Sequence, residues 1–190
     1  MGMTVQRRKD TRTRRVFMHK VADIRGGVSV KVSELGGDFL HEGAVLSAPE
    51  DGICHVVKTA VLSAEASATA TGIKVSKEHN FKVGDFIMAD EGGNAYAITG
   101  IVTTEKSYDT IKVGTTLGVK IEKGGFIIEA AAQATGSDSK LKHTPQSLVG
   151  TGKPIDPKSN LDTDAWLIGV TKGNPLPECI MKHLKGIINY

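Results

Sequence analysis

Short runs of alternating apolar and polar residues fill most of the chain from residue 16 onward. In residues 28–32, Val, Ser, Val, Lys and Val alternate with a period of two, the spacing of a half-buried β-strand. Gly, Pro and Asp-Gly pairs separate these runs, as in the turn at 48–52. The pattern predicts strands at 28–32, 43–46, 53–57, 72–76, 81–88, 95–102, 110–113, 116–121, 126–134, 165–170 and 187–190.

Two other segments bear on the helical content. Residues 59–66 fit either state, because their Ala content favours helix and the Thr/Ser-rich continuation favours strand. Pro175 and Pro177 predict a short helix at 178–184, since proline suits the first helical turn. The apolar residues of this C-terminal segment form a candidate interface between subunits. The alternative is that the helix packs over an open end of a sheet in the same chain. The candidate interface residues are Ile180, Leu184 and Ile187.

Strands that recur every 8–14 residues are typical of a sandwich or barrel. We therefore expect a mainly β protein: a small antiparallel β-sandwich or partly closed β-barrel with an extended basic N-terminal arm and a short C-terminal helix. The arm covers 1–20 and a single β-rich domain covers 21–190. Residues 136–163 are rich in Gly, Ser, Asp, Lys and Pro, so we expect a long surface loop there, either an interface or free.

Charge is distributed unevenly along the 190 residues. The net charge is only +3, yet seven of the first 20 residues are Lys or Arg and one is acidic. The arm thus carries +6, and the remaining chain sums to about −3. We expect the arm to dock on an acidic protein surface, because guanidinium groups make paired hydrogen bonds to carboxylates. The docking residues would be Arg7, Arg8, Lys9, Arg12, Arg14 and Arg15.

Two alternatives for the arm stay open. A phosphate backbone would also attract these charges, but only Phe17 offers an aromatic ring among them, so nucleic acid is the weaker expectation. A solvated tail that aids solubility is the other alternative. No apolar run approaches the roughly 20 residues of a membrane helix, so we expect no membrane partner.

Motifs of catalysis and cofactor binding are missing from the sequence. The stretch 150–153 lacks the residues of a phosphate-binding loop, since Ser147 and Pro154 stand where Gly and Ser/Thr are needed. Two cysteines, Cys54 and Cys179, are too few for a disulfide framework. The six histidines are scattered, and we expect them at the surface, although His41 and Glu42 could converge with His55. We therefore expect no enzyme, no cofactor and no metal.

Several segments between about residues 43 and 190 carry a family resemblance that excludes the arm. They are SKEHNFKVGDFI (76–87), YAIT (96–99), YDTIKV (108–113), TPQSLVGTG (144–152), DAWLIGV (164–170), LP (176–177) and LKGI (184–187). Taken together they resemble head fibre or capsid decoration proteins of tailed bacteriophages and prophages. The family has no catalytic motif, so no functional residue is transferred.

The resemblance implies a β-rich virion protein on the outside of the phage head. Such proteins often form homotrimers, bind the major capsid protein, and either cement the shell or carry projections. The implied location is the outer head surface, after synthesis in the bacterial cytoplasm. The alternatives are a small β-barrel that binds nucleic acid through the arm, and a structural module of the tail or baseplate.

Overall fold

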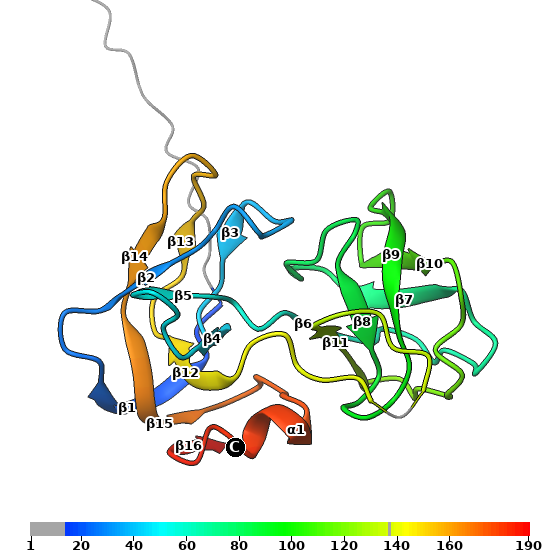
Figure 1. Ribbon diagram of the computed structural model, residues 1–190. Helices are drawn as coiled ribbons and strands as arrows, with labels where there is room; N and C mark the ends of the chain where they lie inside the picture. Colours follow the sequence, from blue (N-terminus) through cyan, green and yellow to red (C-terminus); the bar gives the residue numbers. More distant parts are fainter. Residues whose placement is uncertain (1–13, 137) are drawn as a thin grey trace, which may run out of the picture.

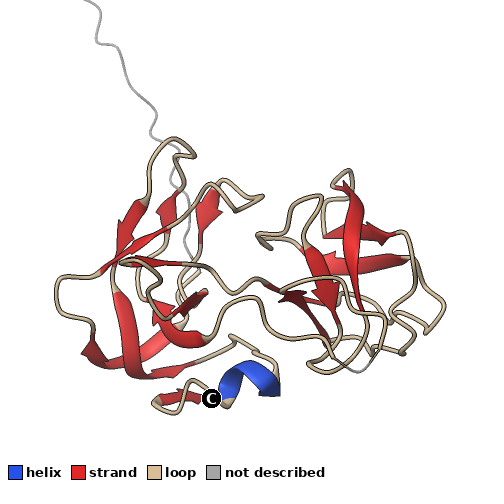
Figure 2. Cartoon of the chain, in the orientation of Figure 1, coloured by secondary structure: helices blue, strands red, loops and turns tan. Residues whose placement is uncertain are grey.

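Two lobes make up residues 14–136 and 138–190, the part of the chain that this computed structural model describes (Figure 1). The first lobe combines segments from both ends of the described chain. The second lobe is inserted between them, and two linkers, near residues 57–59 and 140–144, connect the lobes. Strands dominate both lobes (Figure 2), so the predicted mainly β class is confirmed.

The first lobe is built on a five-stranded sheet with the order β1-β15-β12-β4, in which β16 also pairs with β15. Neighbours are antiparallel except β15 and β16, which run parallel. Two smaller sheets, β14-β2-β5 and β13-β3, complete this lobe. The strands are β1 (Phe17–Asp23), β2 (Val28–Val30), β3 (Phe39–Leu40), β4 (Val45–Ser47), β5 (Ile53–Cys54), β12 (Pro145–Val149), β13 (Lys153–Pro154), β14 (Leu161–Thr163), β15 (Ala165–Thr171) and β16 (Ile187–Asn189).

The second lobe is one antiparallel six-stranded sheet with the order β6-β11-β8-β9-β10-β7. A single bridge joins Leu62, just after β6, to Val75 of β7, so the two ends of the sheet approach each other without closing a barrel. Apolar residues that alternate along these strands point into a common core. The strands are β6 (Thr59–Val61), β7 (Gly72–Ser76), β8 (Phe86–Met88), β9 (Ala95–Val102), β10 (Tyr108–Val113) and β11 (Phe126–Ala130).

A shared apolar cluster joins the lobes. From the second lobe it includes Met88, Ala95 and Ile128, and from the first it includes residues of the C-terminal segment that contains α1 (Glu178–Met181). Ile180, Leu184 and Ile187 are 0%, 2% and 5% exposed within this cluster. The prediction that these three side chains form an oligomer interface is therefore wrong, because they fill the chain's own core. Helix α1 instead contributes to the apolar cluster that both lobes share.

Other differences from the predicted elements have local causes. Residues 136–163 are not one surface loop: they contain β12, β13 and β14, and β12 lies inside the main sheet. Strand β1 begins at Phe17, inside the predicted arm. Residues 116–121 form no strand, and 59–66 begins with the strand β6. Helix α1 ends at Met181, and the amide groups of His183 and Leu184 bond to carbonyls three residues back, a tightened last turn.

Candidate functional site: the root of the basic arm

The point where the arm joins the folded body is held by one carboxylate. The backbone N–H groups of Val16 and Phe17 both donate to Oε1 of Glu42, at 3.1 and 2.8 Å. The carbonyl of Val16 accepts from the N–H of Lys172 at 2.9 Å, and the Val16 side chain is buried. Hydrogen bonds to a charged acceptor are stronger than neutral ones. The arm therefore leaves the body from a fixed position, which we call the arm root.

Arg14 and Arg15 stand at the arm root, and both are exposed. They are the two predicted docking residues that the structure describes. The other four, Arg7, Arg8, Lys9 and Arg12, lie outside the described residues. Lys20 belongs to β1 and is engaged with the body: its Nζ donates to the Gly150 carbonyl at 2.6 Å and lies 5.2 Å from the ring centre of Trp166.

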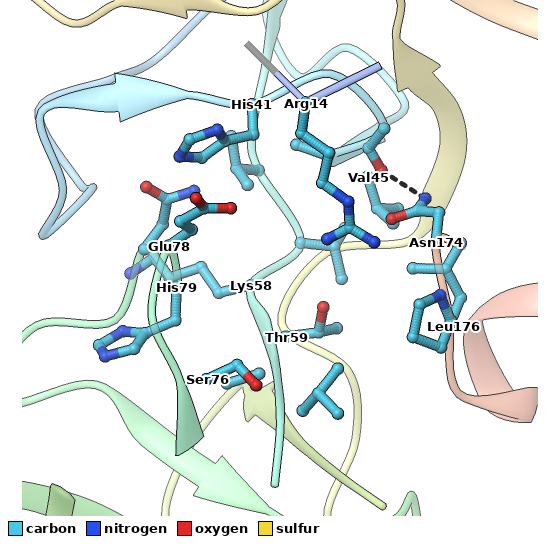
Figure 3. A pocket seen from close by; sticks show the side chains of 18 of the residues that line it. Arg14, His41, Val45, Lys58, Thr59, Ser76, Glu78, His79, Asn174 and Leu176 are labelled. Atoms are coloured by element: carbon cyan, nitrogen blue, oxygen red, sulfur yellow. Dashed lines mark hydrogen bonds between the residues drawn. The ribbon is translucent and has the colours of Figure 1, made fainter. Parts of the chain in front are cut away.

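A pocket of about 290 Å³ lies beside the arm root, and both lobes contribute to its walls. Figure 3 shows the Arg14 side chain extending into this space toward Thr59, with His41 and Glu78 on one side and Asn174 on the other. The wall is fixed on the Asn174 side, because its Nδ2 donates to the Gly43 carbonyl at 3.1 Å.

Gly43 is required in this wall. Its φ is +84°, in the left-handed region, and a Cβ atom there would lie 2.9 Å from both Asn174 Nδ2 and Val16 Cγ1. A larger residue would thus push against the arm root and the pocket wall together.

Charge in the pocket is mostly paired. Lys58 is buried and contacts Asp85 at 2.7 Å and Glu129 at 3.1 Å. Lys77 contacts Asp109 at 2.7 Å. Arg14, in contrast, has no ion pair among the described residues, so it is the cation that the pocket presents to a ligand. A carboxylate side chain of a partner would suit it.

The pocket does not have the geometry of a nucleophile site in its described lining. Ser76 and Thr59 line it, but no hydrogen bond joins either hydroxyl to a histidine within residues 14–136 and 138–190. Burial lowers the pKa of His79, which keeps that ring neutral near pH 7. The arrangement suits recognition of charge better than bond chemistry.

A buried ionic network fixes the two linkers beside this pocket. Lys58 lies on the first linker, and Lys142 lies on the second, where its Nζ contacts Oε1 of Glu129 at 2.9 Å. Burial lowers the pKa of Lys142, but the hydrogen bond to Glu129 outweighs this and raises it. Both linkers thus bind the same carboxylate of β11, which holds the lobes in one arrangement next to the arm root.

Three histidines lie at positions that differ from those expected from the sequence. His55 and His143 are 8% and 9% exposed, so the prediction of surface histidines is wrong for both. His41 does not join His55: it lines the pocket, while His55 contacts Glu34 at 3.0 Å. One sequence signal was available, because His55 lies inside the apolar run 53–57. Possible metal-donor atoms of Glu34, His55 and His143 lie within 4.8 Å of one another.

Comparisons with protein-family models, with curated proteins and with solved structures find no match for this chain. The phage resemblance therefore depends on the sequence segments alone. Among the described residues, no helix has the length and apolar character that crossing a membrane requires.

Proposed function

We propose that this protein is a phage structural protein that binds the outer surface of the capsid through its basic arm. The observation that carries the proposal is the arm root, where Glu42 holds the backbone next to Arg14 and Arg15, the last two of the six predicted docking residues. A fixed arm root reduces the conformational entropy that is lost when the arm binds a partner. The major capsid protein is the proposed partner, and the β-rich body either cements the shell or carries a projection.

The charge distribution supports a protein partner. The arm carries +6 while the rest of the chain carries about −3, so an acidic surface attracts the arm and on average repels the body. Arg14 and Arg15 are exposed at the root, and arginine binds carboxylates in a planar, paired geometry. The sequence resemblance to head fibre and decoration proteins points to the same role.

Self-association, as a homotrimer, is part of the proposal but needs a surface other than the face of α1. Exposed large apolar side chains gather on β1, on β15 and around β16, and they are Met18, Val21, Ile168, Ile188 and Tyr190. An apolar surface of this kind is a candidate contact between copies.

The test is co-sedimentation of the purified protein with capsids that lack it. The arm variant replaces Arg7, Arg8, Arg12 and Arg15 by Ala, and keeps Arg14 because it also lines the pocket. The control replaces four exposed lysines outside the arm by Ala: Lys106, Lys112, Lys123 and Lys140. We expect capsid binding to fall at least about tenfold for the arm variant only. Equal binding by the two variants would contradict the proposal.

A nucleic-acid partner is the second candidate, and the same +6 arm favours it. Its signature is an affinity for duplex DNA that falls steeply with salt, with a log–log slope of several. A flat salt response in a filter-binding assay would remove this candidate and leave the capsid proposal standing.

A further inference from the structure

Two buried histidines lie face to face in the first lobe, away from the arm root. The rings of His55 and His143 are stacked, with centroids 4.2 Å apart and planes 13° from parallel. His55 follows β5, and His143 precedes β12, so the pair joins segments that are far apart in the sequence. Neither histidine lines the pocket beside Arg14.

Each ring has its own carboxylate. His55 Nδ1 lies 3.0 Å from Glu34 Oε2, and His143 Nδ1 lies 3.1 Å from Glu50 Oε1. At His143, the Glu50 carboxylate that accepts from Nδ1–H fixes the tautomer and leaves Nε2 with a free lone pair, the arrangement that often supports a metal-bound histidine. The Nε2 atom of His143 is buried and has no hydrogen-bond partner among the described residues. A buried polar atom without a partner is costly, so it points to a missing ligand.

The charge of the group also suits a cation. Two carboxylates, those of Glu34 and Glu50, lie beside the two imidazoles, each within 3.1 Å of a ring nitrogen.

We propose that Glu34, His55 and His143 bind one divalent transition-metal ion, with Zn²⁺ as the representative, and that Glu50 orients His143 or completes the site. Two imidazoles and a carboxylate are a donor set that Zn²⁺ uses. The donor atoms lie within 4.8 Å of one another. Zn–N and Zn–O bonds of about 2.0–2.2 Å place ligand atoms of a tetrahedral site about 3.4 Å apart.

Binding therefore requires a rotation of one stacked ring and a shortening of the donor distances, which lie within 4.8 Å, by up to about 1.4 Å. The Glu50 side chain is 58% exposed, so the site is open to solvent on that side. This opening gives the ring room to rotate and gives the ion a path into the site. The bound ion would tie the turn at Glu50, the loop at Glu34 and the second linker together. Its role would be structural, and it is independent of the capsid proposal.

The experiment is a calorimetric titration of the EDTA-treated full chain with ZnCl₂, accompanied by Co²⁺ absorption and by melting curves with and without Zn²⁺. We expect one ion per chain, a tetrahedral Co²⁺ spectrum, and a higher melting temperature with Zn²⁺. His143→Ala should abolish all three signals. Glu50→Gln changes an exposed side chain, so it should fold normally and weaken Zn²⁺ binding by about 10- to 100-fold.

The control is His183→Ala, which removes an exposed histidine outside the group. It should bind Zn²⁺ like the unmodified chain. Absence of binding in the unmodified chain would overturn the proposal. So would Zn²⁺ binding that survives both His143→Ala and Glu50→Gln, or that disappears in His183→Ala.

Discussion

At the scale of single residues, Glu42 contributes more to holding the arm root than its sequence context suggests. It follows His41 in a polar stretch and resembles many surface glutamates. In the structure its carboxylate accepts both backbone N–H groups of the arm root, across 25 and 26 residues of sequence. No local pattern encodes a contact of that range. The sequence could therefore predict the arm from its charge, but not the residue that holds it.

Replacing Glu42 by Ala should destabilise the protein by about 1.5–3 kcal/mol, because hydrogen bonds to a charged acceptor are lost at a partly buried site. Glu42→Gln keeps an oxygen acceptor and should cost less. The measurement is urea denaturation. Glu105→Ala, at an exposed position, is the control and should stay within about 0.5 kcal/mol of the unmodified chain. Equal stability of Glu42→Ala and Glu105→Ala would contradict the role of the arm root.

A second residue-scale prediction concerns acid stability. The pKa of Glu34 is lowered from 4.5 to about 2, despite the opposing effect of burial, because His55 and Lys31 bond to its carboxylate. A pKa that is lower in the folded state stabilises the fold above pH 4.5, and this contribution is lost as the pH falls toward about 2. We expect Glu34→Gln to show a shallower loss of stability than the unmodified chain in that window.

This comparison requires denaturation curves between pH 5 and pH 2 in the presence of a chelator, so that no metal contributes. The Glu34 charge also raises the pKa of the neighbouring Glu50, so the variant changes that carboxyl too. The difference between the two curves therefore reports Glu34 together with its coupling to Glu50. Parallel curves would show that Glu34 is not stabilised by its neighbours.

At the scale of elements, alternation predicted the strands of the second lobe best. The ranges 72–76 and 95–102 coincide with β7 and β9, and in β7 buried residues alternate with exposed ones as the pattern predicts. Strand β12 escaped prediction since it begins with Pro, Gln and Ser, although its Ser147 is fully buried. The polar composition of this segment therefore did not indicate a strand. Burial in the main sheet overrides the local preference for a loop.

Helix α1 shows the same dependence on its surroundings. Four helical residues cannot be stable alone, so packing in the shared cluster must hold them. We expect Ile180→Ala to destabilise the protein by about 2–5 kcal/mol in urea denaturation, because it leaves a cavity in this cluster. The exposed neighbour Lys182, replaced by Ala, should change stability by less than about 0.5 kcal/mol. A small effect of Ile180→Ala would mean that its side chain is not in the core.

At the scale of the whole molecule, the arrangement joins an anchored basic arm to a two-lobed β body. The lobes are held by a shared apolar cluster and by one carboxylate, Glu129, that binds lysines from both linkers. Sequence patterning indicated the β class and the charged arm. It could not show that the second lobe interrupts the first, because β4 and β12 pair across about a hundred residues. That pairing places the pocket and the arm root at the junction between the two lobes.

We propose above all that this protein belongs to phage particles. The most direct measurement is quantitative mass spectrometry of purified particles from the source culture, with the number of copies compared with the major capsid protein. We expect many copies per particle in a fixed ratio to the capsid protein, retained through density-gradient purification. Absence from particles, with the protein soluble in the lysate, would contradict the claim.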